Sequence, residues 1–178
     1  MNKEEFLKDI GAWDNHRVLL WMALERTKDS HLPVCEFGAG DGSTPYLRKY
    51  CSENNREFIS LESVAQWAEK CESLHIPNWV TADVYKNYSV CLIDHSPGEH
   101  RHEALAILKD KVDILVVHDS EAAATGYMLD KIWYLFKYRV NCRSIIGEGA
   151  EASALSNTID ITKFADNPGY NGGFKIEV

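Results

Sequence analysis

The stretch "VCEFGAGDGST", residues 34–44, decides the fold of this chain. It begins as a short apolar run that contains one acid, Glu36, and continues as a turn with glycine at positions 38, 40 and 42. Alternating glycines directly after a buried strand predict either a tight corner between strand and helix or a ligand that approaches the backbone closely. The turn alone leaves both interpretations open.

Length and composition indicate one globular domain, residues 1–178. Acidic residues outnumber basic residues 27 to 19, and the net charge of −8 argues against nucleic acid as a partner. Five cysteines without a CxxC pair indicate reduced thiols and a cytoplasmic protein. No apolar run reaches the roughly 18 residues of a membrane helix, so we expect no membrane partner. The oligomeric state stays open, with a homodimer as one option.

Strand-like and helix-like segments alternate along the chain. The expected strands are residues 32–37, 56–62, 78–85, 88–94 and 112–119, and the expected helices are residues 13–25, 44–53, 63–75, 98–110 and 127–138. Two further β-like pieces, 138–144 and 156–162, follow, and the turn-rich end has room for one more strand. This alternation predicts an α/β fold with one doubly wound, mostly parallel sheet of seven strands and helices on both faces.

An acid stands at the end of every one of the first five expected strands. Ligands of doubly wound sheets bind outside these carboxyl ends, and an unpaired carboxylate is costly there. The residues are Glu36, Glu62, Asp83, Asp94 and Asp119, with histidines at His95 and His118. We therefore expect the ligand site at this edge of the sheet.

The glycine spacing favours a ligand without a pyrophosphate. A dinucleotide site requires G-x-G-x-x-G, whereas the glycines here follow G-x-G-x-G. Glu62 could accept both hydroxyls of a ribose, and Asp83 could accept from an adenine amino group. Glu36 and Asp94 could hold a cationic amino or sulfonium group. These roles fit a nucleoside that carries an amino acid.

The ordered segments "CEFGAGDGST", "ISLE", "TADV" and "LID" resemble the motif series of class I S-adenosylmethionine-dependent methyltransferases, over residues 32–164. The resemblance implies S-adenosylmethionine as cofactor and an antiparallel hairpin of the two late β-pieces. It also implies a helical cap, residues 1–30, on the substrate side, with Trp13, Asn15 and His16 as contacts, although for Trp13 and Trp21 we rather expect packing in the core. The residues that it places at the cofactor are Glu36, Gly38, Gly40, Thr44, Glu62, Asp83, Asp94 and His95.

The segment around the fourth and fifth strands is similar to small O-methyltransferases, and it carries the catalytic candidates. His118 suits a general base for a substrate hydroxyl, because the pKa of histidine lies near neutrality. It could equally orient Asp119 or a metal ion. His95 is a second candidate, with a structural histidine bonded to the backbone as the alternative. Of His100, Arg101 and His102, we expect one at most to face the site.

A magnesium ion cannot simply be carried over from the metal-dependent O-methyltransferases. Asp119 is followed by Ser120 where those enzymes have asparagine, and no lysine follows the Asp94–His95 pair. Asp94 and Asp119 could still share a divalent cation with Glu121 and water. The metal question stays open.

The expected function is therefore S-adenosylmethionine-dependent methylation of a hydroxyl on a small molecule, with His118, Asp119 and His95 as catalytic candidates. Two alternatives remain at this point. One is a non-catalytic domain that binds S-adenosylmethionine or another adenosine compound, and the other is a nucleotide-dependent oxidoreductase. The glycine spacing and the absence of a second domain count against the oxidoreductase.

Overall fold

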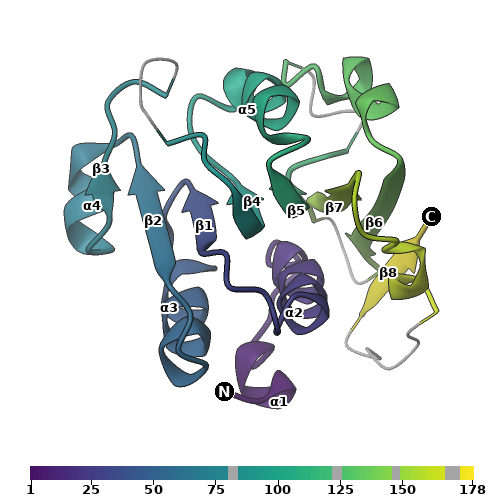
Figure 1. Cartoon of the computed structure of the whole chain (residues 1–178), viewed down its shortest axis with the longest axis horizontal. Helices are drawn as coiled ribbons and strands as arrows, with labels where there is room; N and C mark the ends of the chain where they lie inside the picture. Colours follow the sequence, from purple (N-terminus) through teal and green to yellow (C-terminus); the bar gives the residue numbers. More distant parts are fainter. Residues whose placement is uncertain (80–83, 122–125, 146–148, 167–172) are drawn as a thin grey trace.

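The protein folds around a single eight-stranded sheet with the order β3-β2-β1-β4-β5-β7-β6-β8 (Figure 1). The computed structural model describes residues 1–79, 84–121, 126–145, 149–166 and 173–178. Strands β1 to β5 run parallel to one another, while β7, β6 and β8 are antiparallel to their neighbours. The strands are β1 Val34–Phe37, β2 Phe58–Glu62, β3 Leu74–His75, β4 Tyr88–Ile93, β5 Val112–His118, β6 Tyr138–Ser144, β7 Glu151–Ser156 and β8 Phe174–Glu177.

Helices cover both faces of the sheet (Figure 1). Helix α2 packs on β4, β5 and β7, and α3 packs on β2 in the same hydrophobic cluster. Helix α5 lies on the opposite face, against β4 and β5. The helices are α1 Lys3–Phe6, α2 His16–Arg26, α3 Thr44–Glu53, α4 Ala65–Lys70 and α5 Arg101–Leu108, with short 3₁₀ turns at Gly98–His100, Leu129–Lys131, Trp133–Leu135 and Thr162–Phe164. None of these described helices combines the length and apolarity that a bilayer span requires.

The residues of β1, apart from Glu36, are apolar because helices cover both faces of the sheet at this strand. Val34 points into the cluster beneath α2 and α3, whereas Cys35 and Phe37 point into the cluster beneath α5. A strand that is buried on both faces needs no polar alternation, which is the pattern of central parallel strands. The predicted doubly wound α/β fold, with a mostly parallel sheet and an antiparallel C-terminal hairpin, is confirmed.

The winding of the sheet reverses between β1 and β4. From β1 the chain proceeds to β2 and β3 on one side, and then crosses to β4 on the other side of β1. At such a reversal the loops after the two central strands diverge and leave a site for a ligand. Here these are the glycine turn after Phe37 and the loop that begins at Asp94.

In the described part of the chain the sheet has an eighth strand beyond the seven predicted, Phe174–Glu177, which pairs with β6 in the turn-rich end that had room for one more strand. The seventh strand was also predicted too late, at 156–162. It is Glu151–Ser156, whose small residues Ala152 and Ala154 lie in the cluster beneath α2. The hydroxyl of Ser156 then accepts the N–H groups of Thr158 and Ile159, which turns the chain out of the sheet.

The third strand was predicted at 78–85, of which residues 80–83 lie outside the described part. The structure places β3 at Leu74–His75, within the predicted helix 63–75. Helix α4 ends at Lys70, and Glu72 adopts a left-handed conformation with φ of 51°, which returns the chain to the edge of β2. A left-handed residue is a common way to end a helix.

The predicted helix 127–138 is instead two 3₁₀ turns. Met128 is left-handed, with φ of 52°, and starts the first turn. Leu129 and Ile132 both reach the core, and a spacing of three residues is the repeat of a 3₁₀ helix. The prediction that the apolar residues of this segment are buried was therefore correct, but the predicted α-helical period was wrong.

Candidate functional site

The three glycines of the turn after β1 have different surroundings. Gly38 has φ of 100°, and a Cβ atom there would lie 2.5 Å from the backbone carbonyl of Asp94. A Cβ atom at Gly40 would meet no described atom within 4 Å, and one at Gly42 would lie 3.0 Å from the carboxylate of Asp14. Gly38 thus serves the close packing of two loops, while the surface over Gly40 is open to a ligand.

Glu36 is fully buried behind the turn and accepts hydrogen bonds from three hydroxyl groups. The donors are Ser43 at 2.9 Å, Thr44 at 2.6 Å and Ser60 at 2.6 Å. The hydroxyl of Thr44 also accepts the N–H of Gly40 at 2.9 Å. Glu36 and Thr44, both predicted at the cofactor, therefore hold the shape of the turn from behind. Burial raises the pKa of Glu36 to about 7, although the three hydrogen bonds oppose this rise.

We expect Glu36 to make the protein less stable as the pH rises from about 4.5 to 7. The folded protein holds a proton on Glu36 up to about pH 7, whereas the unfolded chain releases it near 4.5. Between pH 5 and 7.5, wild type should therefore lose about 1–3 kcal/mol of unfolding free energy relative to Glu36→Gln, which cannot ionise. Urea unfolding of both proteins at the two pH values measures this difference. If the difference in unfolding free energy between wild type and Glu36→Gln is the same at both pH values, Glu36 is ionised in the folded protein over this pH range.

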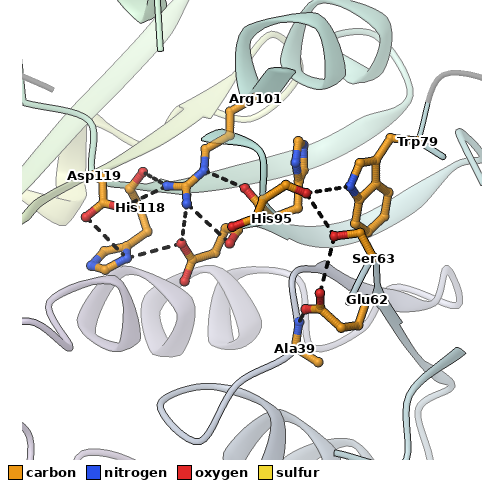
Figure 2. A network of polar contacts seen from close by, with 10 residues as sticks. Ala39, Glu62, Ser63, Trp79, His95, Arg101, His118 and Asp119 are labelled. Carbon is orange, nitrogen blue, oxygen red and sulfur yellow. Dashed lines mark hydrogen bonds and ion pairs between the residues drawn. The ribbon is translucent and has the colours of Figure 1, made fainter. Parts of the chain in front are cut away.

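Glu62 lies at the end of β2 and connects three loops (Figure 2). Its carboxylate accepts the N–H of Ala39 at 2.8 Å and that of Val64 at 2.7 Å. The neighbouring Ser63 donates to the backbone carbonyl of Ser96 at 2.8 Å, in the loop after β4. Oε1 of Glu62 also lies 3.3 Å from the hydroxyl of Ser63, whereas Oε2 has Ala39 as its described donor and a second lone pair that could accept a hydroxyl group of a ligand.

Arg101, from the first turn of α5, joins the ends of β4 and β5 (Figure 2). Its guanidinium lies 3.0 Å from the carboxylate of Asp94 and 3.0 Å from that of Asp119. It also donates to the backbone carbonyls of His95 at 3.1 Å and His118 at 2.9 Å. The side chain is only 6% exposed, so this is a buried cation with several partners. Such a cation fixes the relative position of the two strand ends.

His118 completes this cluster from the end of β5. Its Nδ1 lies 3.3 Å from Asp94 and 3.6 Å from Asp119, while its Nε2 is buried and has no hydrogen-bond partner in the described part of the chain. Burial disfavours the charged ring, but the hydrogen bond to Asp94 and the charges of both carboxylates outweigh it and raise the pKa of His118. The geometry is that of an imidazole oriented through one nitrogen, while the other nitrogen is buried and has no partner among the described residues.

His16 packs against His118, with 4.5 Å between the two ring centroids. It lies at the start of α2, and both of its ring nitrogens are buried without a partner among the described residues. Burial, together with the charge of His118, lowers the pKa of His16 to about 3, so this ring is neutral at physiological pH. The ring also faces Gly42, since its Cε1 lies 3.7 Å from where a Cβ of Gly42 would be. His16 therefore lies between the glycine turn and His118.

Solved structures of methyltransferases share this architecture. The O-methyltransferase of Thermotoga maritima superposes with a TM-score of 0.61 at 10% identity, over 79% of this chain and 64% of that one. The delta-N METTL16 MTase domain gives 0.53 at 12% identity, over 80% and 82% of the two chains. The O-methyltransferase TomG of Streptomyces achromogenes, in complex with S-adenosylmethionine, gives 0.50 at 9% identity, over 78% of each chain.

The chain has the class I methyltransferase fold. The similarity is one of architecture, because no family model matches the sequence and no curated protein matches it.

Within this class I methyltransferase fold, the predicted site residues form two groups at the carboxyl edge of the sheet. Gly38, Gly40, Thr44 and Glu36 build the glycine turn, with Glu62 bound to it through Ala39. Asp94, His118 and Asp119 form the second group and share Arg101. Asp83, predicted to contact adenine, lies outside the described residues.

His95 is not part of either group through its side chain. The ring is fully buried and lies against Trp79, with 4.7 Å between centroids, on the side away from His118 (Figure 2). Burial and the charge of Arg101 lower the pKa of His95 to about 4. Its backbone carbonyl, not its imidazole, contributes to the site by accepting from Arg101. The ring is packed in the core, as in the structural alternative, but both of its nitrogens are buried without a hydrogen-bond partner among the described residues, so the expected bond to the backbone is not seen.

Arg101 is the site residue that was hardest to recognise from sequence. We expected at most one of His100, Arg101 and His102 to face the site, and the buried one is Arg101. His100 and His102 make their hydrogen bonds with Glu103 and the backbone of Glu99 at the surface. The available signal was the proline-containing loop "DHSPGEHR", which returns the chain from Asp94 to the same edge of the sheet.

Proposed function

We propose that this protein is an S-adenosylmethionine-dependent methyltransferase that acts on a hydroxyl group of a small molecule. The observation that carries the proposal is the orientation of His118. Its Nδ1 faces Asp94, while its Nε2 is buried at the carboxyl edge of the sheet without a partner among the described residues. This is the arrangement in which a neutral imidazole can accept a proton from a substrate.

The glycine turn and Glu62 fit S-adenosylmethionine. The open surface over Gly40 allows a ligand to approach the backbone, and the carboxylate of Glu62 can accept ribose hydroxyls beside it. Bound S-adenosylmethionine supplies an electrophilic methyl group. The turn, held by Glu36 and Thr44, orients the ligand.

In the proposed reaction, Asp94 holds the proton of His118 on Nδ1, so that Nε2 carries the free lone pair. Nε2 would take the proton of the acceptor hydroxyl as the oxygen bonds to the methyl carbon, while the methyl–sulfur bond breaks and its electron pair leaves with sulfur as S-adenosylhomocysteine. His16 stays neutral beside His118, so it adds no second positive charge when His118 becomes protonated. Positioning the two reactants in this way contributes much of the rate of such a transfer.

The choice of a small-molecule hydroxyl rests on charge and on structural similarity. The net charge of −8 disfavours a polyanionic acceptor. Two of the similar structures are O-methyltransferases, and one of them, TomG, takes part in the synthesis of tomaymycin. Residues 1–30 remain the proposed substrate-side cap, with Trp13 61% exposed just before α2. Incubation with methyl-labelled S-adenosylmethionine and a panel of hydroxylated small molecules identifies the acceptor.

We expect S-adenosylmethionine to bind, and Glu62→Gln to weaken this binding about tenfold or more. The variant loses the charge that accepts hydrogen bonds from the ribose, and hydrogen bonds to charged groups contribute about 1.5–3 kcal/mol. Isothermal titration calorimetry measures the affinity, and Glu69→Gln on the exposed face of α4 is the matched control. No heat of binding with wild type would refute the proposed function. Binding without transfer to any acceptor would favour a non-catalytic domain.

A further inference from the structure

We propose that Arg101 is the resident cation of this site and takes the place of a divalent metal ion between Asp94 and Asp119. The site is then complete without a metal. This inference concerns the charges at the ends of β4 and β5, so it does not depend on whether the protein transfers methyl groups.

The positions of the donors support this assignment. Nη2 of Arg101 lies 3.0 Å from Oδ1 of Asp94, and Nη1 lies 3.0 Å from Oδ2 of Asp119 (Figure 2). Nε and Nη1 add hydrogen bonds to the backbone carbonyls of His95 and His118. The ring of Tyr127 lies 4.8 Å from the guanidinium carbon on another side. A planar group with several fixed donors suits two carboxylates better than a single point charge does.

The same acids would be the natural ligands of a metal. One ligand atom from each of Asp94, His118 and Asp119 lies within 4.8 Å of the others, which is the spacing of a metal cluster. However, magnesium requires about six ligands, mostly oxygen atoms, in octahedral geometry. Both carboxylates already bind Arg101, and Glu121, the third expected acid, accepts the backbone N–H of Glu151 instead. The residues present do not fit a magnesium ion.

Charge balance leads to the same conclusion. Asp94 and Asp119 together carry two negative charges, and Arg101 reduces their sum to −1. A protonated His118 reduces it to zero. A divalent cation at hydrogen-bonding distance from a buried guanidinium would be repelled strongly, because electrostatic interactions are poorly screened in a buried site.

Arg101 also fixes the conformation of Asp119. This residue follows β5 with φ of 52°, a left-handed conformation that is unfavourable for a non-glycine residue. The ion pair with Arg101 and the hydrogen bond to the preceding carbonyl hold it there. Arg101 is thus a positioning residue, which sets the direction of Asp94 and, through it, of His118.

Titration with Mn²⁺, followed by the electron paramagnetic resonance signal of the free ion, tests this inference. We expect wild type to bind no Mn²⁺ at up to about 1 mM, the weak end of hard-cation sites. In Arg101→Met the two carboxylates lose their cation, and Mn²⁺ should bind about tenfold or more tightly than to wild type. Asp94→Asn in the Arg101→Met background should abolish the gain. Arg48→Met, which removes an exposed arginine that pairs with Glu72, should behave as wild type.

Two results would overturn the inference. The first is stoichiometric Mn²⁺ binding by wild type that Asp94→Asn removes. The second is a folded Arg101→Met protein, as judged by circular dichroism and a cooperative thermal transition, that gains no Mn²⁺ site. If Arg101→Met does not fold, the wild-type titration still tests whether the site binds Mn²⁺. Arg101→Lys then serves as the second variant, because it keeps the positive charge and should exclude Mn²⁺. None of these measurements uses an acceptor substrate, so a failure here is distinct from a failure of the proposed function.

Discussion

Replacing His118 by alanine is expected to lower the rate of methyl transfer about 10²–10⁴-fold, the usual contribution of a general base. The affinity for S-adenosylmethionine should change little, because the glycine turn and Glu62 make no hydrogen bond to His118. Initial rates with the acceptor from the labelled-donor panel, and calorimetry with the cofactor, measure the two effects. His31→Ala, an exposed histidine before β1, is the control.

The pH dependence of the rate distinguishes a base from a structural histidine. Only the neutral ring of His118 can accept a proton, so the rate should rise with pH through the pKa of His118, which Asp94 and Asp119 raise above 6.5. Asp94→Asn removes the hydrogen bond and one negative charge, so the rise should move to lower pH. A rate that is independent of pH, or one that survives in His118→Ala, would exclude His118 as the base.

Replacing Gly38 by alanine is expected to cost about 3 kcal/mol or more of unfolding free energy. The new Cβ would lie 2.5 Å from the backbone carbonyl of Asp94, and a positive φ of 100° is strained for alanine. Both the overlap and the strain contribute about 1–3 kcal/mol each, and backbone atoms cannot move aside as a flexible side chain can. Urea unfolding measures the loss.

Gly40→Ala is the matched comparison within the same turn. No described atom lies within 4 Å of its added Cβ, so the unfolding free energy should stay within about 1 kcal/mol of wild type. The affinity for S-adenosylmethionine should instead fall about tenfold or more, because the methyl group occupies the surface that the ligand approaches. If Gly40→Ala binds the cofactor as wild type does, the ligand does not lie over this part of the turn.

Much of the fold follows from local patterns that the sequence displays directly. The strands β1, β4 and β5 are buried on both faces, so most of their residues are apolar and the strands are easy to recognise. The errors lie where an element depends on distant partners. β3 has only two residues and exists because the edge of β2 can pair with them. β7 consists mostly of small residues, and its place is set by α2 and β5.

The sequence by itself determined that the glycine turn and the acids lie at one edge of the sheet. The reason is that parallel strands bring their carboxyl ends to the same edge, whichever side chains they carry. The sequence also predicted Asp94, His118 and Asp119 at this edge. Only the tertiary structure decided how they are used. It placed Gly38 against the backbone of Asp94 and turned His95 away toward Trp79. It also brought Arg101, the first residue of α5, between the two carboxylates. These contacts depend on how the loops after the strands pack against one another, and no local sequence pattern records that packing.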